Sequence, residues 1–114
     1  MLWACVVLCS YEEKTDGEYM NMLYEWDEEK DKLNQKKHDM PLDAGIPVFD
    51  DEYRLERQDT RNDYGEDRFI TIGRNRYTDI LYVCYTMRGQ NRTRLISVRM
   101  AERSEVRLYE QNLR

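Results

Sequence analysis

Residues 68–101 read RFITIGRNRYTDILYVCYTMRGQNRTRLISVRMA, and this stretch decides the fold. It contains three runs of β-branched and aromatic residues, at 68–73, 80–85 and 93–99, each bounded by Gly, Asn, Asp or Arg. Such runs are typical of strands joined by turns. Parallel strands need crossovers of a dozen residues or more, so we expect an antiparallel meander. The middle run lacks strict alternation, which predicts a central strand covered on both faces.

The same part of the chain is basic, and the part before it is acidic. From Arg68 to the C-terminus there are ten arginines, no lysine and four acids, a net charge of +6. Because the whole chain carries −5, residues 1–67 carry −11. Arginine suits bidentate phosphate recognition. Solvated strand edges and ion pairs with the acidic half explain the charge equally well.

Weaker signals on either side complete the predicted order of elements. Residues 23–26 are a short strand candidate, and Asp27 can cap a helix that ends with bases at His38. Pro41 opens a second helix, which Pro47 keeps short or kinked. The remaining elements are a polar edge strand at 53–57, a charged loop at 58–67 and a last helix from Ala101 or Glu102 to Gln111. The predicted fold is α+β, a small antiparallel sheet with N-terminal helices and a C-terminal helix.

Residues 1–21 differ from the rest. Residues 1–9 form an apolar run that is too short to span a bilayer and has no basic leader. Met20 and Met22 could each serve as a start. The extension is therefore a mis-set start, which we favour, or a loose added strand, or a weak export signal. We expect one domain over residues 22–114.

Cysteine and histidine usage argues against a metal site. There are three cysteines (Cys5, Cys9 and Cys84) and one histidine, without the spacing of a zinc site. Cys84 lies in the predicted central strand, where it is most simply a buried apolar residue. We expect no metal, no cofactor, no association with a membrane and a cytoplasmic location.

Several fragments together resemble a known family. They are Trp26-Asp27-Glu28-Glu29-Lys30, Asn34, Lys37-His38, Val48-Phe49-Asp50-Asp51, Glu66-Asp67-Arg68-Phe69, Ile72-Gly73, Tyr85-Thr86-Met87-Arg88, and Arg94-Leu95-Ile96-Ser97-Val98-Arg99-Met100-Ala101 with Glu105 and Tyr109. In this order and spacing, over about residues 22 to 111, they resemble the BrnT toxins. Relatives often carry His at the position of Tyr85 and Glu at that of Met87.

The resemblance implies a function, a fold and two partners. It implies a ribonuclease toxin of a bacterial type II toxin–antitoxin pair, with a RelE-like fold and RNA as substrate. A cognate antitoxin, whose own ribbon-helix-helix domain binds the operator, would neutralise the toxin in a hetero-oligomer.

Metal-free RNA cleavage needs a group that takes the 2′-hydroxyl proton, one that protonates the 5′-oxygen, and cations around the phosphate. The candidates for catalysis are Arg99, His38, Arg94, Lys37 and Tyr85, and those for binding substrate are Lys30, Arg68 and Arg88. His38, the only histidine, has an ordinary pKa of ~6.5, which suits proton transfer. Arg94 and Arg99 are five apart, so they share a face only if a bulge intervenes or Arg99 lies beyond the strand end.

Each candidate also has a plainer explanation. His38 and the lysines could be helix-end charges in solvent, and Tyr85 could be strand packing. Glu105 could orient an arginine or be an ordinary helix acid. Two other functions therefore stay open: a degenerate toxin that only binds RNA or an antitoxin, and an interaction domain whose acidic half docks a basic partner.

Overall fold

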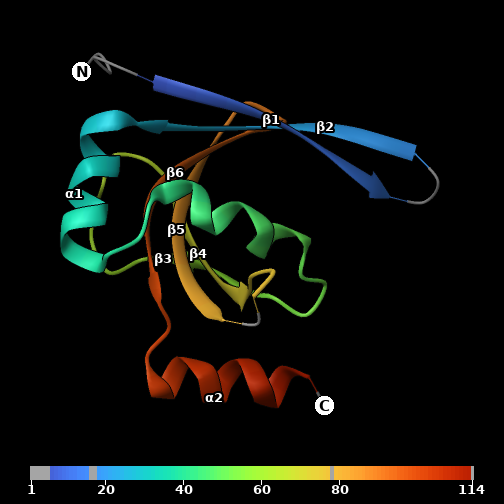
Figure 1. The fold of residues 1–114 in the computed structure, drawn as a ribbon, viewed down its shortest axis with the longest axis vertical. Coiled ribbons are helices and arrows are strands. Elements are labelled where there is room, and N and C mark those ends of the chain that lie inside the picture. The colour runs from blue at the N-terminus through green and yellow to red at the C-terminus, as the bar shows by residue number, and fades with distance from the viewer. Residues whose placement is uncertain (1–5, 16–17, 78, 114) are drawn as a thin grey trace.

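The computed structural model describes residues 6–15, 18–77 and 79–113, with side chains from residue 23 onward. Within these residues it contains one six-stranded sheet and three helices (Figure 1). The strands are β1 (Val6–Thr15), β2 (Glu18–Asp27), β3 (Leu55–Asp59), β4 (Arg68–Arg74), β5 (Ile80–Arg88) and β6 (Arg92–Met100). The helices are α1 (Glu28–His38), the 3₁₀ helix η1 (Leu42–Asp50) and α2 (Arg103–Asn112).

The sheet is mixed, with the strand order β1-β2-β6-β5-β4-β3. Antiparallel pairing of β4, β5 and β6 confirms the predicted meander, and β3 lies at the expected edge. The prediction of an antiparallel sheet is wrong at one junction, because β2 pairs parallel with β6 from Leu23 to Glu25. The connection between these strands contains α1, η1 and three strands, which is ample for a parallel crossover.

The N-terminal extension continues the sheet beyond the predicted strand. β2 begins at Glu18 rather than at residue 23, and β1 pairs antiparallel with it along its whole length. Residues 1–5 lie outside the described residues, as do the side chains through residue 22. The assignment of residues 1–21 to a segment outside the domain, with a mis-set start, stays a prediction.

Alternation along β5 and β6 gives the sheet two faces. One face, which we call the η1 face, packs against η1 and forms the main hydrophobic core; its central residues are Leu81, Val83, Tyr85, Leu95 and Val98. The other, which we call the α2 face, carries the even-numbered residues of β5, among them Tyr82 and Cys84. There Tyr82 packs with Tyr109 of α2 in a second cluster. Cys84 is buried, as predicted.

A bulge in β6 decides which face its arginines occupy. The register between β5 and β6 shifts between Cys84 and Tyr85, which leaves Ile96 as the extra residue of β6. An extra residue reverses the alternation beyond it. Arg94 and Arg99 therefore lie on the same α2 face. One of the two conditions for a shared face, an intervening bulge, is met.

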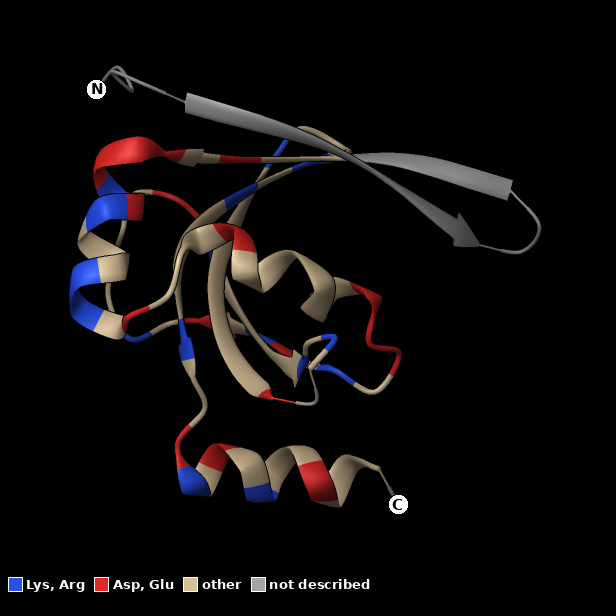
Figure 2. Cartoon of the chain, in the orientation of Figure 1, with Lys and Arg blue, Asp and Glu red and all other residues tan. Residues whose placement is uncertain are grey.

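Helix α1 packs along the edge of β6 through one amide. Asp27 caps the helix as predicted, accepting a hydrogen bond from the Glu29 N–H (3.0 Å). The Asn34 amide donates to the carbonyl oxygens of Val98 (2.8 Å) and Met40 (2.7 Å), and its oxygen accepts from the Val98 N–H (3.1 Å). Beyond the part of β6 that pairs with β2, the Asn34 side chain thus satisfies the backbone N–H and carbonyl groups of Val98. Figure 2 shows the acidic start and basic end of α1.

Helix η1 covers the core because its backbone can come close to the sheet. Pro47 lies within it, and the element has 3₁₀ rather than α-helical form, in line with the predicted disturbance. A Cβ at Gly45 would lie 2.9 Å from Val98 Cγ2, so only glycine permits this approach. Trp26 and Phe49, expected in the core, are buried there.

Helix α2 docks on the opposite face by its first turn and by one tyrosine. Glu102 caps it in a capping box with Glu105, which confirms the predicted start. Tyr109 is 1% exposed, and its hydroxyl donates to Asp51 Oδ2 (2.5 Å). No helix in the described part of the chain is long and apolar enough to cross a membrane.

Candidate active site

The α2 face has rows of side chains that run across the strands. One row is Leu55, Ile72, Tyr82 and Arg99; the next is Arg57, Ile70, Cys84 and Ser97. Helix α2 covers the first row, where Tyr109 packs against Ile72 and Tyr82. Arg57 and Ser97, at the two ends of the second row, reach the surface. This face is therefore apolar under α2 and polar beside it.

Arg99 is held in place by three groups. Its guanidinium donates to both carboxylate oxygens of Glu105, at 2.8 and 2.9 Å, and to the Met100 carbonyl oxygen at 3.1 Å. Its Cζ lies 3.8 Å from the centre of the Tyr82 ring. The side chain remains 24% exposed. Glu105 raises the pKa of Arg99, so Arg99 presents a fixed charge at the surface.

His38 ends α1 near this arginine. Burial lowers the pKa of His38, and the charges of Lys37 and Arg99 lower it further. The lowered pKa favours the neutral imidazole, which is the form that accepts a proton. The packing of α1 along β6 thus brings His38 within electrostatic reach of Arg99.

A shallow groove of about 230 Å³ runs between α1 and β6. It is lined by Lys30, Leu33, Asn34, Lys37, His38, Ile96 and Ser97. Three predicted site residues, Lys30, Lys37 and His38, therefore line one groove. An anion in it would meet two lysines and a neutral imidazole.

Arg94 lies on the same face but in a different setting. It is 8% exposed, and its guanidinium donates to Glu25 Oε2 at 3.0 Å. Glu25 is 2% exposed and has a second, more distant partner in Arg92 (3.6 Å). The two residues face each other across the parallel β2–β6 pair. The structure thus places Arg94 in a buried ion pair between strands.

Arg68 and Arg88 are brought together by a shared acid. Glu66 accepts from Arg68 Nε at 3.3 Å and from Arg88 Nη2 at 3.0 Å. Arg68 also lies over the Tyr64 ring, 4.2 Å from its centre. Both arginines belong to the far ends of β4 and β5, and the structure does not gather them with His38.

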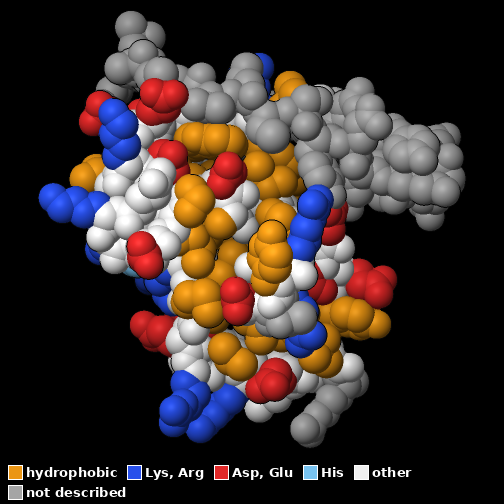
Figure 3. Space-filling model, in the orientation of Figure 1, with side chains coloured by type: hydrophobic (Ala, Val, Ile, Leu, Met, Phe, Trp, Pro, Cys, Tyr) orange, Lys and Arg blue, Asp and Glu red, His pale blue; other side chains and the backbone are white. Residues whose placement is uncertain are grey.

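Tyr85 lies on the opposite face of the sheet. Its ring packs against Phe49 (5.0 Å between centres) and Phe69 (5.6 Å), and it is 6% exposed. Burial raises the pKa of Tyr85 to about 12, with a smaller contribution from Glu56. The sheet itself therefore separates Tyr85 from Arg99 and His38. Figure 3 looks onto this η1 side, where hydrophobic side chains gather at the centre.

Comparison with known families decides the identity. Residues 26–105 match the family described as "Ribonuclease toxin, BrnT, of type II toxin-antitoxin system". The chain belongs to the BrnT family. Its fold is similar to the crystal structure of the Brucella abortus ribonuclease toxin BrnT, at 25% sequence identity and a TM-score of 0.52. That similarity covers 68% of this chain and 94% of the Brucella toxin. A search of curated proteins found no significant match.

Two further arginines of this BrnT-family chain lie on the α2 face and were not expected there. Arg57 follows Leu55 by two on β3 and so points to the same face. Arg61 is held by two 2.9 Å hydrogen bonds to Asp59, which is 5% exposed; these bonds lower the Asp59 pKa. Alternation in the edge strand could have indicated Arg57. Nothing in the charged loop singles out Arg61.

A metal ion at the site would need several side chains that could bind it. Among residues whose side chains are described, no three His, Cys, Asp or Glu are grouped as they would be around a metal ion. The acids of the α2 face are instead paired with arginines, as Glu105 is with Arg99, and His38 lines the groove between α1 and β6. The chemistry open to this arrangement is charge stabilisation by Arg99 and proton transfer by His38.

Proposed function

We propose that this BrnT-family protein is a metal-independent endoribonuclease that arrests growth by cutting RNA. The observation that carries the proposal is a groove lined by Lys30, Lys37 and His38, with the fixed Arg99 within electrostatic reach of His38. A positioned guanidinium stabilises charge that develops on phosphorus, which is often the largest single contribution to such catalysis.

The proposed reaction uses the RNA 2′-hydroxyl as nucleophile. Its oxygen attacks the neighbouring phosphorus while neutral His38 accepts the proton. The bond from phosphorus to the 5′-oxygen breaks, and this oxygen takes up a proton, for which Lys37 is the candidate donor. The products are a 2′,3′-cyclic phosphate and a 5′-hydroxyl. Lys30 would hold the substrate, and Arg68 and Arg88 would contribute positive charge farther along the face, whereas Arg94 is engaged by Glu25.

A degenerate toxin that only binds RNA or an antitoxin is the second candidate. Tyr85 favours it, because relatives often carry His there, whereas the Tyr85 hydroxyl is buried with a pKa of about 12. Such a hydroxyl stays protonated at neutral pH and cannot act as a base. If the histidine of relatives is their proton acceptor, this chain has lost it.

The family also suggests a partner and a location. We infer that a cognate antitoxin with a ribbon-helix-helix domain binds this toxin in a hetero-oligomer in the cytoplasm. The RelE-like character of the fold belongs to the same proposal. Positive charge on the α2 face gives an acidic antitoxin segment a complementary surface.

The test is cleavage of a long RNA by the purified full chain in excess EDTA. Arg99→Ala and His38→Ala should each slow cleavage by about 10²–10³, while Lys36→Ala on α1 and Arg107→Ala on α2, which remove exposed charges outside the groove, should not. The 3′ ends should carry cyclic phosphate. Loss of cleavage in EDTA with recovery in magnesium would end the metal-free proposal. An inactive wild type that still binds RNA would establish the degenerate toxin instead.

A further inference from the structure

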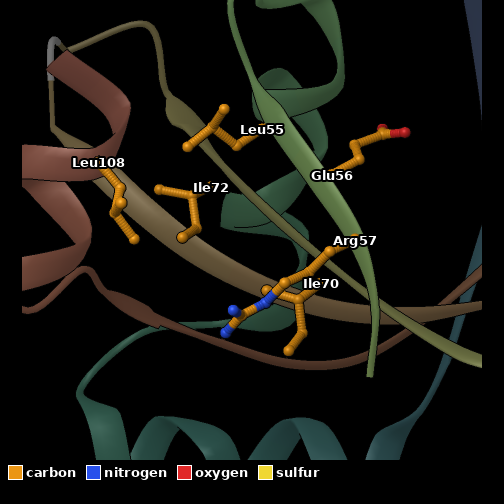
Figure 4. Close-up of a pocket in the computed structure, with 6 residues that line it drawn as sticks. All are labelled: Leu55, Glu56, Arg57, Ile70, Ile72 and Leu108. Atoms are coloured by element: carbon orange, nitrogen blue, oxygen red, sulfur yellow. The ribbon is translucent and has the colours of Figure 1, made fainter. Parts of the chain in front are cut away.

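A pocket of about 200 Å³ opens between α2, β3 and β4 (Figure 4). Its apolar lining consists of Leu55, Ile70, Ile72 and Leu108. Leu108 points from α2 toward Ile72, and Arg57 extends past Ile70, whereas Glu56 points away. Leu108 is 50% exposed, so the helix leaves this apolar surface accessible. The pocket therefore combines apolar walls with one guanidinium.

The size and shape of the pocket limit what it can hold. Sites for whole drug-sized ligands measure ~300–1,000 Å³, so about 200 Å³ suits one ring system rather than a whole small molecule. A flat ring fits between leucine and isoleucine side chains and an arginine plane. Guanidinium groups stack on aromatic faces, and single-stranded RNA bases are bound in this way.

The pocket lies near the Arg99 site. Arg57 lies close enough to Glu105 to lower the pKa of that carboxyl, and Glu105 is the group that holds Arg99. Ile72 and Arg99 belong to one row across β4, β5 and β6. Two strand spacings separate them, about 10 Å. One or two nucleotides bridge such a distance.

We propose that this pocket binds a nucleobase of the RNA, next to the phosphate held at Arg99. The proposal rests on the proposed function and deepens it, because it assigns a subsite that determines sequence preference. Arg57 stacks on one face of the base, and Leu108 with Ile72 contacts the other. The Arg57 guanidinium, which reaches into the pocket while Glu56 points away, favours a base within a polyanion over an uncharged aromatic ligand. Removal of a stacking group typically weakens binding about tenfold or more per base.

The first experiment separates the base from the phosphate. Methyl NMR signals of Leu108 and Ile72 are followed while AMP, GMP, CMP or UMP is added, with ribose 5-phosphate as the probe without a base. At least one nucleotide should shift these methyl signals, and ribose 5-phosphate should not. Signals of Arg99 and His38 should respond to both, which tests the phosphate site of the proposed function separately. Equal shifts with ribose 5-phosphate, or no methyl shifts at all, overturn the base subsite alone.

The second experiment uses cleavage preference. Leu108→Ala and Arg57→Gln change exposed side chains, so both should fold. Each should reduce the preference for the favoured nucleotide about tenfold, measured as kcat/KM on RNAs that differ in one base. Leu113→Ala, exposed at the end of α2 and outside the pocket, is the control and should keep the preference. Unchanged preference in both pocket variants overturns the proposal. The proposal is also overturned if a partner protein shields the Leu108 methyl groups and none of the nucleotides does.

Discussion

Arg99 and Glu105, six residues apart, join the last strand to the last helix by two hydrogen bonds of 2.8 and 2.9 Å. Glu105 also accepts the Glu102 N–H at 2.7 Å, so one carboxylate both caps α2 and orients the arginine. The first turn of α2 is thus a structural support for the candidate catalytic cation. The contribution of Glu105 to orienting Arg99 can be separated by mutation from its contribution to capping α2.

A double-mutant cycle tests this support. Glu105→Ala should lower kcat about tenfold, because Arg99 then loses its bidentate partner and samples other rotamers. In an Arg99→Ala background the same change should have no further effect on kcat, since Glu105 acts through Arg99. Glu102→Ala, which alters the same cap but does not contact Arg99, is the control and should leave kcat unchanged. Additive losses in the double variant would show that Glu105 has a role of its own.

The single histidine makes the pH dependence testable. Because the pKa of His38 is lowered, cleavage should rise with pH through a value below 6.5 and then level off. Removing a nearby cation in Arg99→Gln should raise that pKa, which NMR titration of the one imidazole measures directly. A histidine that resists protonation in the folded state stabilises it fully above its unfolded pKa, and that contribution is lost as pH falls. If Arg99→Gln leaves the pKa of His38 unchanged, the charge of Arg99 does not act on His38.

Local signals in the sequence account for most of the fold. Turn residues and alternation located β4, β5 and β6, and Asp27 and Glu102 marked the starts of α1 and α2. The parallel pairing of β2 with β6 had no local signal, because it joins residues almost 70 positions apart. It depends on how α1 and η1 return the chain to the sheet.

The candidate site was predictable in its residue types but not in its arrangement. The conditional expectation for Arg94 and Arg99 named the bulge correctly, yet nothing marked Ile96 as the extra residue. The register between distant strands decides which arginines form ion pairs with buried or shared acids. Glu25, for example, faces Arg94 because β2 pairs with β6. Strand alternation puts Tyr85 on the face opposite to that of Cys84 and Thr86. Which of the two faces is buried is determined by the packing of η1, and this is not visible in the sequence.

Asn34 should be the most sensitive position on α1. Asn34→Ala removes three hydrogen bonds and leaves the Val98 N–H and carbonyl without a partner on the edge of β6. Each unsatisfied buried group costs about 1–3 kcal/mol, so the free energy of unfolding should fall by about 2–4 kcal/mol. Gln35→Ala, exposed on the same helix, should change it by less than about 0.5 kcal/mol. Urea denaturation of both variants measures the difference; equal values would contradict this role for Asn34.

The N-terminal extension should be dispensable. A chain that begins at Met20 keeps the part of β2 that pairs with β6 and loses only β1 and the start of β2. Its melting temperature should therefore stay within a few degrees of the full chain, and cleavage should be unchanged. Thermal melting of the two chains side by side is the measurement. A large drop would mean that residues 1–9 supply core surface and belong to the domain.

The Glu25–Arg94 pair allows a structural arginine to be distinguished from a catalytic one. Arg94→Ala leaves a carboxylate that is 2% exposed and whose remaining partner, among the side chains that the structure describes, is the more distant Arg92 (3.6 Å); this should cost about 3–5 kcal/mol. Replacing both partners, as in Glu25→Leu with Arg94→Met, removes the buried charges together and should restore most of the stability. If Arg94 serves the β2–β6 junction alone, this double variant also recovers RNA cleavage. A stable double variant that does not cut RNA would instead return Arg94 to the catalytic set, because its fold would be intact while its chemistry was lost.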